Sequence, residues 1–109
     1  LSIVATDEPK NVYDGLLISG DFNGWGTDTK MIPVNTVEGV VNHVWKYELD
    51  ATSGDTTAKF LYAGWTPNWG ASTFPYGFGV NGGANIPVVG GKYVAILNDI
   101  DGYYHFFSK

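Results

Sequence analysis

The chain has 109 residues, with six lysines, no arginine, eleven acidic residues and a net charge of −5. This length supports one domain with one core, and the acidic balance disfavours nucleic acids and anionic membrane surfaces as partners. The absence of cysteine excludes a disulfide framework and a thiolate metal site. Because the chain begins at Leu1 rather than Met, we expect residues 1–109 to be one domain excised from a longer protein.

Short apolar runs between turn-forming residues predict strands along the whole chain. In chain order, these runs are 16–18, 43–49, 58–63, 93–97 and 103–107. The last two flank Asn98-Asp-Ile-Asp-Gly102, which suits a hairpin turn. About seven or eight short strands at this spacing predict an all-β fold, an Ig-like antiparallel β-sandwich. Residues 66–85 are rich in Gly, Asn and aromatic residues and are expected to form a long functional loop.

Trp45 and Trp25 stand in different sequence contexts. Trp45 alternates in register with Tyr47 and Leu49 inside a predicted strand, so we expect it in the core. Trp25 lies in Asp21-Phe-Asn-Gly-Trp-Gly-Thr-Asp28, where turn-forming neighbours carry no pattern that would direct the ring inward. An exposed ring is expected, and the alternative is a ring that folds back over a sheet edge.

Trp65 and Trp69 lie just after the predicted strand that contains Lys59. Strand alternation places Lys59 and Trp65 on one face. A face that starts with lysine and ends with tryptophan does not suit the core at both ends, so Trp65 is expected to be exposed. For Trp69 two outcomes stay open, because a ring before Gly70 could also pack under the loop.

Several motifs that suggest cofactors or metals fail on their context. Gly77-Phe-Gly-Val-Asn-Gly82 matches a dinucleotide-binding pattern, but no strand-then-helix unit surrounds it. Asp99-Ile-Asp-Gly102 resembles the start of a calcium loop, but the glutamate required at its twelfth position would fall beyond the end of the chain. His43 and His105 have no partner at metal-ligand spacing. We therefore expect no cofactor and no metal.

Asp21 and Asp28 flank Trp25 and raise the question of glycoside hydrolysis. A glycosidase needs an acid with a raised pKa in a desolvated cleft. Acids in a Gly-rich turn of a small sandwich offer no such burial, so we expect no catalytic residues. Flat exposed rings beside isolated polar groups instead suit sugars, whose apolar faces rest on indoles and whose hydroxyls bond to Lys and Asn side chains.

Four landmarks now occur in order over most of the chain, from about Ile18 to Phe107. They are 18–25 (ISGDFNGW), 59–65 (KFLYAGW), 82–86 (GGANI) and 91–96 (GKYVAI). In this order they resemble the repeated domains of SusE/SusF-type starch-binding surface lipoproteins, and they are similar to the family 48 and family 20 starch- and glycogen-binding modules. The third landmark reads Ala84-Asn85 where those modules have Asn-Asn.

The resemblance implies a non-catalytic α-glucan-binding module of Ig-like fold. Trp25 and Trp65 would form an aromatic platform, Lys59 would bond to adjacent sugar hydroxyls, and Asn85 would support it. Trp69 is added to this site from local sequence alone. The resemblance also implies a place on the extracellular face of a bacterial outer membrane, anchored through parts outside this chain and beside other glycan-uptake proteins, with no membrane contact by the domain itself.

Two alternatives stay open. The domain could be an Ig-like spacer or assembly domain, which predicts tryptophan rings that are buried or far apart. It could also bind another polysaccharide such as a β-glucan or xylan, whose flat chain would favour coplanar rings.

Overall fold

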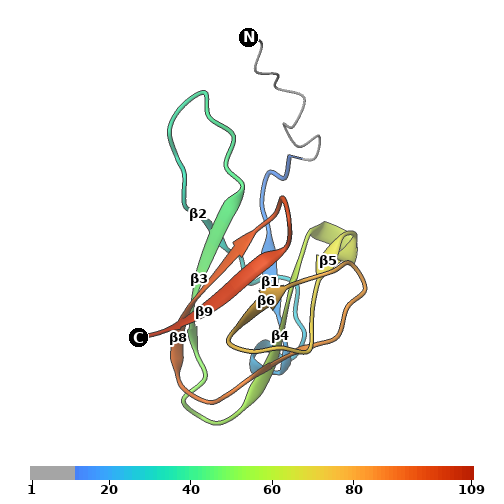
Figure 1. Ribbon diagram of the computed structural model, residues 1–109, viewed down its shortest axis with the longest axis vertical. Helices are drawn as coiled ribbons and strands as arrows, with labels where there is room; N and C mark the ends of the chain where they lie inside the picture. The colour runs from blue at the N-terminus through green and yellow to red at the C-terminus, as the bar shows by residue number, and fades with distance from the viewer. Residues whose placement is uncertain (1–11) are drawn as a thin grey trace.

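The computed structural model describes residues 12–109, which hold nine strands and two single-turn 3-10 helices (Figure 1). The 3-10 helices are η2 (Asp21–Asn23) and η3 (Ala63–Trp65). The strands are β1 (Leu17–Ser19), β2 (Ile32–Pro33), β3 (Val44–Asp50), β4 (Thr56–Leu61), β5 (Asn68–Trp69), β6 (Tyr76–Phe78), β7 (Ile86–Val88), β8 (Lys92–Asn98) and β9 (Tyr103–Ser108). No helix in this part of the chain is long and apolar enough to span a bilayer.

The strands form two antiparallel sheets, which confirms the predicted all-β sandwich. One sheet has the order β2-β3-β8-β9-β6. The other has the order β1-β4-β5, and β7 pairs with the first half of β4. β8 and β9 follow each other in the chain and pair antiparallel, so the hairpin predicted at residues 98–102 is confirmed.

Aromatic side chains from both sheets fill the space between them. Phe60 of β4 lies 6.0 Å, between ring centroids, from both Tyr104 and Phe106 of β9. Trp45 is only 3% exposed, so its predicted place in the core is confirmed. Tyr47 is half-buried and packs against the edge of this core. The alternation of apolar and polar residues in the strands therefore identified the core face.

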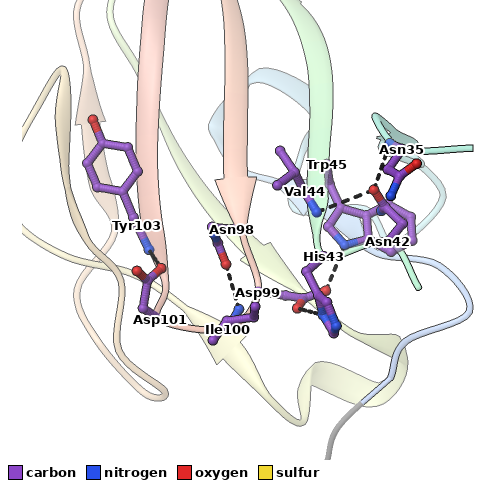
Figure 2. A network of polar contacts seen from close by, with 10 residues as sticks. All are labelled: Asn35, Asn42, His43, Val44, Trp45, Asn98, Asp99, Ile100, Asp101 and Tyr103. Atoms are coloured by element: carbon purple, nitrogen blue, oxygen red, sulfur yellow. Dashed lines mark hydrogen bonds and ion pairs between the residues drawn. The ribbon is translucent and has the colours of Figure 1, made fainter. Parts of the chain in front are cut away.

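A buried carboxylate joins the β8–β9 hairpin to β3 (Figure 2). Asp99 accepts a hydrogen bond from Trp45 Nε1 at 2.8 Å through Oδ2, and its Oδ1 lies 2.7 Å from His43 Nδ1. A buried indole N–H needs such an acceptor. Inside the turn, Asn98 Oδ1 accepts from the backbone N–H of Ile100 at 2.8 Å. His43 and Asp99, two of the residues first considered for metal binding, thus contribute to the contact between the hairpin and β3. No cluster of three metal-ligating side chains occurs within residues 12–109.

The prediction of one long loop over 66–85 is wrong, because this segment contains β5 and β6. Phe60 pairs with Trp69, and Tyr76 pairs with His105. A Cβ atom at Gly77 in β6 would lie 2.2 Å from Thr73 Oγ1, so a larger residue there would displace the Thr73 side chain. Strands of two or three residues carry too little alternation to be read from sequence. They form here because longer strands, β4 and β9, offer a free edge.

Candidate functional site

The same backbone conformation precedes Trp25 and Trp65, where the chain departs from the β1–β4–β5 sheet. Each follows a glycine in the left-handed conformation, Gly24 with φ 66° and Gly64 with φ 75°. Each tryptophan then adopts a positive φ itself, 61° for Trp25 and 65° for Trp65. Within residues 12–109 they are the only residues other than glycine that do so.

This backbone conformation is costly for a bulky residue. A non-glycine residue held at positive φ costs about 1 to 3 kcal/mol and persists only where surrounding contacts impose it. Such residues gather at ligand-binding sites. That both outliers of the described chain are tryptophans in contact with each other marks this place as the candidate functional site.

The two rings form one tilted pair. Their centroids lie 6.1 Å apart, and their planes make an angle of 40°. Both side chains are half-buried, so each ring keeps surface open to solvent. The rings of Trp25 and Trp65, both expected to be exposed, are thus half-buried, and they contact each other. The indole N–H of Trp25 donates to Asp21 Oδ1 at 2.9 Å.

Asn23 holds the loop that carries Trp25. Its Oδ1 accepts from the backbone N–H of Gly20 at 3.0 Å, and its Nδ2 donates to Ile18 O at 3.2 Å and to Thr29 Oγ1 at 2.9 Å. The backbone N–H of Trp25 also donates to Gly20 O at 2.9 Å. Gly20 must be glycine, because a Cβ atom there would lie 1.8 Å from Thr57 O on β4.

Asn68 does the same for the loop that carries Trp65. Its Nδ2 donates to Trp65 O at 3.0 Å, and its Oδ1 accepts from the backbone N–H of Gly82 at 3.1 Å. Its own backbone N–H donates to Asn81 Oδ1 at 3.0 Å. Sequence reasoning missed both asparagines as positioning residues. Asn23 could have been found from its place between two glycines in a turn, whereas nothing local marks Asn68.

Lys59 lies in β4 at the point where both tryptophan loops leave the sheet. β1 ends at Ser19, which is the register partner of Lys59, and β4 itself ends at Leu61. Lys59 Nζ donates to Gly83 O at 2.7 Å, and partial burial lowers the pKa of the ammonium group. No carboxylate among residues 12–109 forms an ion pair with it. An ammonium group has three N–H donors, so two remain available to a ligand or water.

Asn85 comes directly before β7. Ile86, the first residue of β7, pairs with Ala58, so Asn85 and Lys59 flank this pair at the same end. The Asn85 side chain is exposed and makes no hydrogen bond within the described chain. Its amide is therefore free to donate and to accept.

Trp69 does not belong to this site, and its assignment as a binding residue is wrong. The side chain is 7% exposed and belongs to the core. Its ring meets Tyr13 edge to face at 5.6 Å, and its Cβ atom lies against Gly79. The pairing of β5 with β4 turns this residue inward, next to Phe60. Of the two outcomes left open by the sequence, packing under the loop is the correct one.

A second group of rings, exposed except for the half-buried His105 and here called the outer aromatic patch, lies on β6 and β9. It consists of Tyr76, Phe78, Tyr103, His105 and Phe107. His105 and Phe107 stack on each other at 3.9 Å, and Tyr103 Oη lies 3.1 Å from His105 Nδ1. Several ring faces and polar groups of the patch are thus used within the protein, which makes it a weaker candidate than the Trp25–Trp65 pair.

Trp25 and Trp65 do not line the hollows found beside Trp45 and beside β6. These two hollows have volumes of about 360 and 400 Å³. The first opens beside Leu16, Met31 and Trp45, and the second beside β6. A shallow aromatic surface suits a long chain that passes over it better than a small molecule that must be enclosed.

Comparison with solved structures agrees with the sandwich. SusF from Bacteroides thetaiotaomicron superimposes with a TM-score of 0.70 over 90% of this chain, at 18% sequence identity. The match spans 24% of the SusF chain, so this chain corresponds to about a quarter of that protein. No protein-family model matches the chain, and no curated protein matches it by sequence. The SusF-like fold expected from the sequence landmarks is confirmed.

Proposed function

We propose that this domain binds α-glucan chains without catalysis, through the Trp25–Trp65 pair. The observation that carries the proposal is the pair itself: two half-buried indoles 6.1 Å apart, both held at positive φ. An indole face accepts the apolar face of a glucose ring. The SusF-like fold and the sequence resemblance to starch-binding domains support the same ligand class.

The angle between the rings favours a curved glycan over a flat one. α-1,4-linked glucose chains coil, whereas β-1,4-linked chains extend nearly flat and suit coplanar rings. A tilt of 40° lets the two indoles meet successive sugar faces of a coiled chain. Lys59, through its two remaining donors, and the free amide of Asn85 would then bond to hydroxyls at the edge of the sugar.

Hydrolysis is not part of the proposal. Asp21 and Asp28 are both exposed, and Asp21 already accepts the indole N–H of Trp25. Exposed carboxylates lack the desolvation that keeps a glycosidase acid protonated.

The spacer alternative predicts rings that are buried or far apart, so the contact between two half-buried rings argues against it. From the sequence resemblance to SusE/SusF-type domains, we also propose a location on a bacterial cell surface, beside other glycan-uptake proteins.

Affinity electrophoresis in amylopectin tests the proposal. The wild-type domain should be retarded, and a shallow site of this kind should bind maltooligosaccharides with a Kd of roughly 10 µM to 1 mM. Trp25→Ala and Trp65→Ala should each weaken binding by more than about tenfold, as expected for aromatic anchors. Wild-type mobility unchanged relative to an inert protein would refute the proposal.

Phe78→Ala is the matched control, because this ring is 60% exposed but lies in the outer aromatic patch. The control should keep wild-type retardation. If Phe78→Ala abolishes retardation and the two tryptophan variants do not, the site lies on the outer aromatic patch instead. Retardation by a linear β-glucan but not by amylopectin would favour the flat-chain alternative.

A further inference from the structure

The indole of Trp25 is held by a carboxylate whose own position is fixed. Asp21 Oδ1 accepts the Trp25 Nε1 hydrogen bond at 2.9 Å. The backbone N–H of Asp21 donates to Thr57 Oγ1 on β4 at 3.2 Å, and its carbonyl accepts from the backbone N–H of Gly24 at 3.3 Å. The Asp21 backbone is therefore bonded to β4, while its carboxylate accepts the hydrogen bond from the Trp25 indole.

The bond to Asp21 is the only side-chain hydrogen bond of Trp25 within residues 12–109. Trp25 sits on a turn outside the core, and its side chain has two rotatable bonds. Its neighbour Trp65 contacts it with the ring centroids 6.1 Å apart and the ring planes at 40°, and the Trp25 indole N–H donates to Asp21. A hydrogen bond to an ionised acceptor is stronger than one between neutral groups, so Asp21 is suited to fix the ring orientation and with it the angle between the indoles.

We infer that Asp21 is a positioning residue that sets the angle of the Trp25 ring and makes the site selective for glucans of fixed curvature. The inference rests on the proposed function. A site whose rings are oriented before the ligand arrives loses less side-chain freedom on binding. This advantage is greatest for a rigid ligand, because a flexible chain can follow a rotated ring and a rigid one cannot.

The same contact argues against a direct role for the indole N–H in sugar binding. With Asp21 in place, Trp25 Nε1 is already used and the ring offers its face rather than its edge. If the N–H were instead a sugar donor restrained by Asp21, removal of the carboxylate would free it and strengthen binding. The two roles thus predict opposite effects of the same substitution.

The test compares Asp21→Ala with Asp21→Asn on two probes, β-cyclodextrin and maltoheptaose, which hold the same number of α-1,4-linked glucose units in a rigid ring and in a flexible chain. Asp21→Ala should weaken β-cyclodextrin binding by about tenfold and maltoheptaose binding by no more than about threefold. Asp21→Asn should restore most of both affinities, because the amide oxygen can accept the same bond. Asp28→Ala, an exposed acid of the same loop, is the matched control and should leave both unchanged.

A second measurement reports the bond without any sugar. In ¹H–¹⁵N spectra, the Trp25 indole N–H should exchange with solvent more slowly in wild type and Asp21→Asn than in Asp21→Ala. Equal loss of both affinities in Asp21→Ala, a gain in either, or unchanged indole exchange would each overturn the inference. If wild type binds neither probe, the proposed function fails, whereas failure of the inference alone leaves wild-type binding intact.

Discussion

Asn23→Ala should both destabilise the domain and loosen the Trp25 loop. The Asn23 side chain makes three well-formed hydrogen bonds, at 3.0, 3.2 and 2.9 Å, to Gly20, Ile18 and Thr29. Each such bond contributes a net ~0.5 to 1.5 kcal/mol. The free energy of unfolding should therefore fall by about 2 to 4 kcal/mol, because the alanine leaves the Gly20 N–H and the Ile18 carbonyl without this partner.

Urea denaturation followed by tryptophan fluorescence measures this change directly. For a domain of this size, the same loss corresponds to a Tm lower by roughly 8 to 16 °C. Asn23→Asp should give an intermediate loss, because it keeps the acceptor for Gly20 and loses both donors. Asn85→Ala is the control, since this exposed asparagine makes no side-chain hydrogen bond in the described chain. A loss below about 0.5 kcal/mol for Asn23→Ala would refute the reasoning.

Three further substitutions test contacts elsewhere in the two sheets. Gly70→Ala should lower the free energy of unfolding by about 1 to 3 kcal/mol and weaken retardation in amylopectin, because the new Cβ atom would lie 2.1 Å from a backbone oxygen. Gly15→Ala is the control and should be neutral, because the space around Gly15 is open. Burial lowers the pKa of Lys59, so the unfolded chain binds this proton more tightly than the folded protein does. In urea titrations, the wild type should therefore gain stability relative to Lys59→Met as the pH rises toward 10.5. A loss of relative stability over this range would contradict the reasoning. Asp99→Ala should lower the free energy of unfolding by about 2 to 4 kcal/mol in the same assay, because it leaves the buried Trp45 indole N–H without its acceptor. A loss near zero would show that water replaces the carboxylate.

The sandwich and its core could be predicted from the sequence because a strand with one buried face repeats every two residues. Trp45 and the 98–102 hairpin follow from this periodicity and from turn-forming residues, and both predictions are confirmed. The sequence also placed Trp25 and Trp65 outside the regular strands, and both lie there directly after a glycine with positive φ.

Contacts between distant segments decided the rest. Trp69 and Trp65 lie four positions apart in similar sequence, yet pairing of β5 with β4 buries Trp69 and leaves Trp65 half-buried beside Trp25. The 40° angle of the tryptophan pair and the role of Asn68 likewise have no local signal. Local sequence determines where the chain can turn and which face of a strand is apolar; only the packing of segments far apart in the chain determines which rings meet and which are covered.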